Sequence, residues 1–129
     1  MSARLASALV LVALAAAAAP ATGAGQGISG RVVAGPTCPV ETIPPDPRCA
    51  PAAVAARVRV VRRSDHHLVA QPRTRTDGSF RIRLRPGRYS VTARPVAGGP
   101  LPRCPPGINA TVRAGHYTRV AISCDSGIR

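Results

Sequence analysis

Apolar and polar residues alternate with a period of two through much of this chain, and this alternation limits the possible folds more than any other feature. In the clearest stretch, Phe80, Ile82 and Leu84 alternate with Arg81 and Arg83. Successive side chains of a strand point to opposite faces of a sheet, so the three apolar residues would point inward and the two arginines outward. Turn residues, chiefly proline and glycine, interrupt the pattern repeatedly, which predicts an antiparallel β domain.

Seven strand-like segments with one apolar face each predict an all-β, seven-stranded antiparallel sandwich of two sheets. The segments are 28–33, 53–61, 68–70, 79–84, 89–93, 108–112 and 117–124. We expect Val58, Phe80, Ile82, Val91 and Val120 in the core between the sheets. Pro86-Gly87 fits the centre of a type II turn, and residues 85–88 are expected to form a corner between the two sheets.

Residues 1–24 have the pattern of a cleaved secretory signal peptide. A positive start precedes an apolar run at 5–19, and small residues that suit a signal peptidase follow it. The run is shorter than the ~20 residues that span a bilayer, so no transmembrane anchor is expected. We therefore expect a single β-sandwich domain at 26–129 that is secreted, either extracellular or periplasmic, and associated with the cell envelope if its charge attaches it there.

Four cysteines, an even number in an exported chain, predict two disulfide bonds. Sequence alone permits three pairings. We predict Cys38–Cys49, because both lie in one proline-rich loop, and Cys104–Cys124, because these two flank one strand pair. In the loop-entropy description each bond destabilises the unfolded chain by about 3 kcal/mol. A zinc site is not expected, because no two cysteines lie two to four residues apart.

The basic residues of the chain are all arginine, 18 in number, against five acids, and the formal net charge is +13. This excess predicts an acidic partner such as an acidic polysaccharide, a cell-envelope polymer or an anionic surface. The other interpretation is compositional, because a GC-rich genome favours arginine codons. Readers of nucleic acid usually supply stacking aromatic residues, which are scarce here, so no specific nucleic-acid partner is expected.

Catalytic and metal sites find little support in the sequence. Asp65, His66 and His67 form the most site-like cluster, but adjacent strand residues point to opposite faces, so we expect a solvated turn. Paired cysteines offer no thiol nucleophile, and the acids are scattered along the chain. We therefore expect a protein without enzymatic activity, cofactor or bound metal.

Three segments carry a resemblance to a known family: 28–32 (ISGRV), 76–82 (TDGSFRI) and 84–91 (LRPGRYSV). They resemble the carboxypeptidase regulatory-like domains, which belong with the transthyretin-like (prealbumin-like) and collagen-adhesin B-type sandwiches. The segments 35–40 (GPTCPV) and 125–129 (DSGIR) look like those of small exported bacterial members. The resemblance implies a structural or adhesive interaction module. The alternative is a carbohydrate-binding accessory module, which an exposed Tyr89 or Tyr117 in a concave site would support.

The resemblance also implies which arginines share a surface. It would place the first strand, the strand around Phe80 and the last strand in one sheet. The outer face of that sheet would then display a candidate polyanion-binding set, which consists of Arg31, Arg81, Arg83 and Arg119. The other sheet would display Arg57, Arg59, Arg94 and Arg113.

Overall fold

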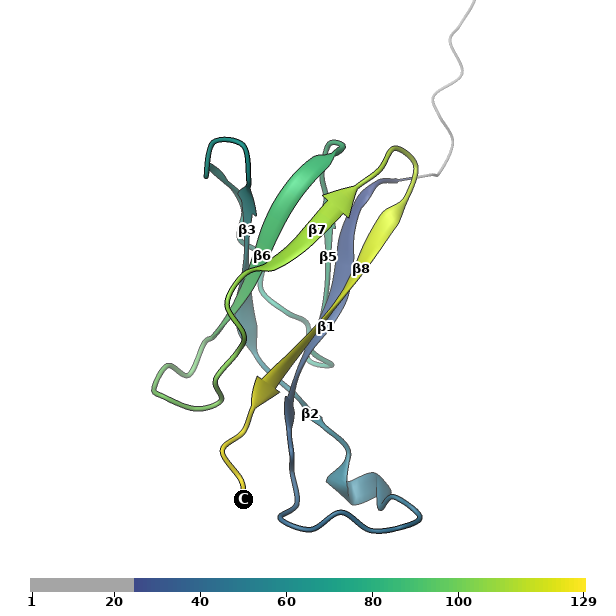
Figure 1. Ribbon diagram of the computed structural model, residues 1–129, viewed down its shortest axis with the longest axis vertical. Helices are drawn as coiled ribbons and strands as arrows, with labels where there is room; N and C mark the ends of the chain where they lie inside the picture. The colour runs from purple at the N-terminus through teal and green to yellow at the C-terminus, as the bar shows by residue number, and fades with distance from the viewer. Residues whose placement is uncertain (1–24) are drawn as a thin grey trace, which may run out of the picture.

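The computed structural model describes residues 25–129, which form two four-stranded β-sheets arranged as a sandwich (Figure 1). The signal peptide predicted for residues 1–24 lies outside the described residues. Within 25–129 the strands are β1 (Gly27–Gly35), β2 (Ala52–Ala53), β3 (Ala56–Arg62), β4 (Leu68–Ala70), β5 (Ser79–Arg83), β6 (Gly87–Pro95), β7 (Ile108–Val112) and β8 (Tyr117–Asp125). A short 3-10 helix, η1, spans Pro47–Cys49.

Strand β1 is the centre of the first sheet. It pairs antiparallel with β5 along one half and with β2 at its end, and it pairs parallel with β8 on its other side. The second sheet is antiparallel throughout, in the order β4-β3-β6-β7. The predicted sandwich is confirmed, with β2 as an additional short strand and one parallel pair. Parallel neighbours need a long connection, and nearly the whole domain separates the first strand from the last.

The segment predicted as one strand, 53–61, is divided between the sheets. Its first residues belong to β2 and the rest to β3, and the chain crosses from one sheet to the other at Val54 and Ala55. The Thr74 hydroxyl holds the crossing, because it donates to the Val54 carbonyl at 2.9 Å and accepts from the Ala56 amide at 3.0 Å. The Ala55 carbonyl accepts from the Val96 amide at 2.9 Å.

The core between the sheets is built from aliphatic residues with two aromatic rings, and the described residues contain no buried charged or polar side chain. The five predicted core residues are all buried, which confirms the inward phase of their strands. Phe80 lies opposite Gly30 across the β1–β5 pair. A Cβ at Gly30 would approach the Phe80 ring to 2.8 Å and the Val120 carbonyl to 2.0 Å. Glycine at position 30 therefore makes room for the only phenylalanine of the chain.

Residues 85–88 connect β5 of the first sheet to β6 of the second, so the predicted corner is confirmed. The buried Tyr89 fastens this corner, because its hydroxyl donates to the Arg85 carbonyl at 2.6 Å. The predicted type II turn is wrong. Such a turn needs positive φ at its third residue, and Gly87 is not among the glycines with positive φ. Strand β6 begins at Gly87 itself, so this residue already has strand geometry.

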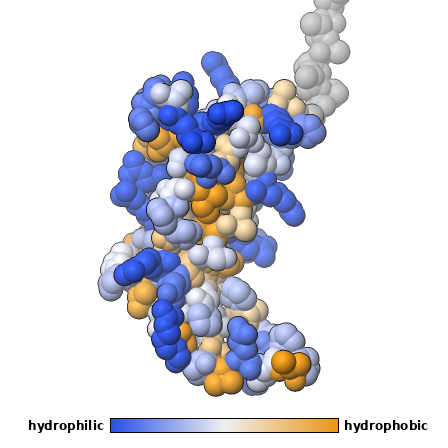
Figure 2. All heavy atoms as spheres, viewed as in Figure 1, coloured by the Kyte–Doolittle hydropathy of each residue, from blue (hydrophilic) through white to orange (hydrophobic). Residues whose placement is uncertain are grey.

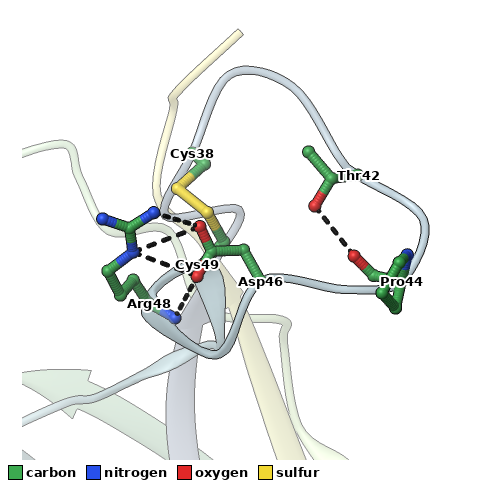
Figure 3. A network of polar contacts seen from close by, with 6 residues as sticks. All are labelled: Cys38, Thr42, Pro44, Asp46, Arg48 and Cys49. Carbon is green, nitrogen blue, oxygen red and sulfur yellow. Dashed lines mark hydrogen bonds and ion pairs between the residues drawn. A yellow bond between two sulfur atoms is a disulfide. The ribbon is translucent and has the colours of Figure 1, made fainter.

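The disulfide bonds Cys38–Cys49 and Cys104–Cys124 form as predicted. The first closes the proline-rich loop between β1 and β2, in which the Asp46 carboxylate accepts from the Arg48 guanidinium at 2.8 Å (Figure 3). The second ties the β6–β7 loop to β8. Figure 1 places the β1–β2 loop and the C-terminus at one end of the sandwich, and the β3–β4 turn and the β5–β6 corner at the other. A search of residues 25–129 finds no helix that is long and apolar enough to cross a membrane.

Candidate functional site

Three of the four arginines of the predicted polyanion-binding set line one shallow groove on the outer face of the first sheet. These are Arg31, Arg81 and Arg119, and Arg75 from the β4–β5 connection joins them. The groove has a volume of about 580 Å³, and we call it the sheet groove. The other residues that line it are mostly small: Ser29, Gly30, Val33, Ser79, Phe80, Val120, Ala121, Ile122 and Ser123.

Strand register explains why these arginines share a face. Ser29 in the middle of β1 pairs with Arg81 of β5 on one side and with Arg119 of β8 on the other. Directly paired residues point to the same face of a sheet, so two guanidinium groups flank one small residue. Arg31 follows two residues later on the same face, since strand side chains alternate. The face thus presents arginines around a low central strand.

Arg81 lies over the ring of Tyr117, with its guanidinium carbon 3.9 Å from the ring centroid. This contact reaches from β5 to β8 across β1, where the intervening residues are Gly27 and Ser29. Their small side chains leave the path across β1 open. A guanidinium stacked on an aromatic face is stabilised by about 0.5–1 kcal/mol at an exposed site, so Arg81 is partly ordered before any ligand binds.

Asp77 is the acid that faces the sheet groove, where its carboxylate lies 3.6 Å from the Arg31 guanidinium. The Ser79 hydroxyl donates to this carboxylate at 2.6 Å and the Ser79 amide at 2.9 Å. These hydrogen bonds, chiefly that of the hydroxyl, lower the pKa of Asp77, and Arg31 contributes less. Asp77 therefore stays ionised at neutral pH and offsets one arginine. Within residues 25–129, no ion pair engages Arg75, Arg81 or Arg119.

Arg83, the fourth member of the predicted set, lines a different cavity, a cleft of about 880 Å³ at the end of the sandwich. Four further arginines line the same cleft: Arg62 and Arg63 from the end of β3, and Arg85 and Arg88 from the β5–β6 corner. We call this cavity the arginine cleft. Strongly hydrophilic residues are prominent at this end of the molecule in Figure 2. Arg81 and Arg83 lie two residues apart on β5, so the sheet groove and the arginine cleft are neighbours.

Sequence reasoning missed these four additional arginines. They come from two segments about twenty residues apart, and the pairing of Arg62 with Tyr89 across β3 and β6 brings those segments together. The available signal was the position of the arginine pairs, since each pair lies where a strand meets a turn. That signal gave no indication that the two turns share one end of the sandwich.

The second sheet also carries arginines on its outer face, as the resemblance implied. Arg57 of β3 pairs directly with Arg94 of β6 and, on its other side, forms an isolated bridge with Arg73. Arg59 follows Arg57 on the same face, whereas Arg113 lies in the turn just after β7. Like charges placed directly opposite one another are destabilising. Basic surface therefore covers both faces of the sandwich, and the two cavities distinguish the first sheet and the cleft end.

The Asp65–His67 cluster lies in the exposed turn between β3 and β4. His66 has a positive φ of 57°, and the Asp65 carboxylate accepts from the His67 amide at 3.2 Å. The same carboxylate lies 3.4 Å from the Arg62 guanidinium. Within the part of the chain that the structure describes, no three histidine, cysteine or acidic side chains gather as a metal-binding group. The aspartate serves the turn and Arg62.

The tyrosines do not meet the condition set for a carbohydrate platform. Tyr89 is buried in the core, with 5% of its surface exposed. Tyr117 is half-buried, and Arg81 covers one face of its ring. Phe80 is buried as well, and the chain has no tryptophan.

No protein-family model and no curated protein matches this chain. The fold, the two cavities and their arginines are therefore the basis on which its function is argued.

Proposed function

We propose that this protein is a non-enzymatic, exported interaction module that binds acidic polymers of the cell envelope along the sheet groove. The observation that carries the proposal is the convergence of Arg31, Arg75, Arg81 and Arg119 on one groove that contains a single carboxylate, that of Asp77. Guanidinium groups pair with carboxylate, sulfate and phosphate groups through paired hydrogen bonds. A polymer that repeats such groups would contact several of the arginines at once.

The resemblance to carboxypeptidase regulatory-like and transthyretin-like sandwiches supports a structural or adhesive role, since such domains serve chiefly as interaction modules. Two disulfide bonds are consistent with an exported protein, because disulfides persist in oxidising compartments. The shape of the groove also fits an extended ligand. It runs over small side chains on the central strand, and a sugar or polyol backbone could lie there between the arginines.

The test is binding of the purified protein to teichoic acid or heparin at about 50 and about 300 mM salt, where screening of exposed charges differs strongly. Wild-type protein should bind at low salt and weaken steeply as salt rises. The variant Arg81→Ser/Arg119→Ser should lose about tenfold or more in affinity, since each basic residue near an anionic surface contributes about 1 kcal/mol. Both side chains are exposed, so the melting temperature should change little.

The matched control is Arg57→Ser/Arg94→Ser, which removes the same charge from the opposite sheet. A larger loss in the groove variant than in this control supports the proposal. Equal losses would mean that the polymer senses net charge and not the groove. Wild-type protein without salt-sensitive binding would overturn the proposal and leave the arginine content compositional.

A further inference from the structure

The arginine cleft is the larger of the two basic cavities, and its geometry differs from that of the sheet groove. The groove is a shallow surface over one sheet, whereas the cleft lies where the two sheets end, between the β3–β4 turn and the β5–β6 corner. A cavity of about 880 Å³ lies in the size range of sites that hold small organic ligands.

Charge in the cleft is almost uncompensated. Arg62 has Asp65 as a partner at 3.4 Å, whereas no carboxylate among residues 25–129 forms an ion pair with Arg63 or with the other three arginines of the cleft. Converging like charges repel one another, and the repulsion grows where protein walls reduce the contact with water. An anion with several charges would remove this repulsion.

The backbone of the cleft is well fastened, although its charged side chains are free. The Arg63 amide donates to the Arg88 carbonyl at 3.0 Å, which joins the β3–β4 turn to the corner. The Tyr89 hydroxyl holds the Arg85 carbonyl at 2.6 Å. The arginine stems therefore start from fixed points on two connected segments. Such preorganisation lowers the entropy that binding must overcome.

The remaining walls are partly apolar. Val69, Leu84, Pro86 and the buried ring of Tyr89 line the cleft beside the guanidinium groups. Inorganic anions alone would leave these walls without a partner. A ligand that combines a compact, highly charged group with an apolar body would use both kinds of surface.

We propose that the arginine cleft binds a small organic diphosphate, with the diphosphate on Arg63, Arg85 and Arg88 and an apolar body against Val69, Leu84 and Pro86. Arginine recognises phosphate oxygens through paired hydrogen bonds, and a diphosphate offers enough oxygens to engage several guanidinium groups together. The site is separate from the polymer-binding groove, so each can fail without the other.

The test is isothermal titration calorimetry of the purified protein with inorganic pyrophosphate and with geranyl diphosphate. We expect one saturable site for each and tighter binding of geranyl diphosphate. The variant Arg85→Ser/Arg88→Ser should weaken both by about tenfold or more, since hydrogen bonds to charged groups are strong. Its melting temperature should stay near that of wild type, because only the backbones of these residues take part in the contacts that hold the corner.

The control Arg81→Ser/Arg119→Ser removes equal charge from the sheet groove and should leave the diphosphate affinity within about twofold of wild type, because screening weakens interactions between distant exposed charges. Equal weakening in both double variants, or no saturable binding, would overturn the proposal. Geranyl diphosphate that binds no tighter than pyrophosphate would overturn the assignment of the apolar walls. Should the cleft variant melt early, Arg63→Ser provides the same comparison from the opposite wall.

Discussion

The Thr74 hydroxyl holds the chain where it crosses between the sheets, and removing it should destabilise the whole domain. Thr74→Val keeps the shape of the side chain but deletes one donor and one acceptor. The Val54 carbonyl then loses its 2.9 Å bond and the Ala56 amide its 3.0 Å bond. Each backbone group left without a partner in a buried setting costs about 1–3 kcal/mol. Because Thr74 is half-buried and water reaches part of the site, we expect a total loss of about 2–3 kcal/mol.

Urea unfolding and thermal melting of oxidised protein measure this loss. A domain of this size shifts its melting temperature by roughly 4–8 °C per kcal/mol, so the Thr74→Val variant should melt about 10 °C or more below wild type. Thr74→Ser is the matched control, because it retains the hydroxyl and loses one methyl group, which contributes at most about 0.8 kcal/mol. Equal stability of the valine and serine variants would refute the reasoning, since the crossing would then not depend on the hydroxyl.

Three further predictions concern the core, the covalent ties and the acidic turn. Phe80→Ala should cost about 3–5 kcal/mol in urea unfolding, because Gly30 opposite cannot fill the cavity, and an unchanged midpoint would contradict the buried position of the ring. Cys104→Ala/Cys124→Ala should cost about 3 kcal/mol relative to oxidised wild type, and a variant as stable as wild type would show that the bond does not constrain the unfolded chain. The pKa of Asp77 is lowered on folding, so its contribution to stability is present above the unfolded pKa and is lost as pH falls through the folded pKa. Wild type should therefore lose more stability than Asp77→Asn between about pH 6 and about pH 3, and parallel pH profiles would exclude this role.

Much of the fold follows from the alternating pattern. The strands at 68–70 and 108–112 have the predicted bounds, and the inward phase of Phe80, Ile82 and Val91 is as expected. The crossing at Val54 and Ala55 was beyond reach, because Val54 and Ala56 continue the apolar alternation without a break. Only the placement of Thr74, distant in sequence, reveals the change of sheet.

The candidate site divides in the same way. The arginines of the sheet groove could be grouped because the resemblance implied which strands share a sheet. The arginine cleft depends on the register between β3 and β6, which brings Arg62 and Arg63 to the corner that carries Arg85 and Arg88. Period-two patterning assigns a face to each residue, but it does not say which turns meet.

The disulfide-closed loop at 38–49 has a practical consequence for engineering. Its ends are joined covalently, and Val40 and Ile43 within it are exposed, so most of its sequence contributes little to the core. Exposed loops of this kind accept replacement, because lengthening a loop raises its closure cost only slowly. The loop lies at the opposite end of the sandwich from the β5–β6 corner (Figure 1). A foreign peptide grafted between the two cysteines would therefore be displayed away from the arginine cleft, and the domain could act as a scaffold that presents one sequence while its other end remains free to bind.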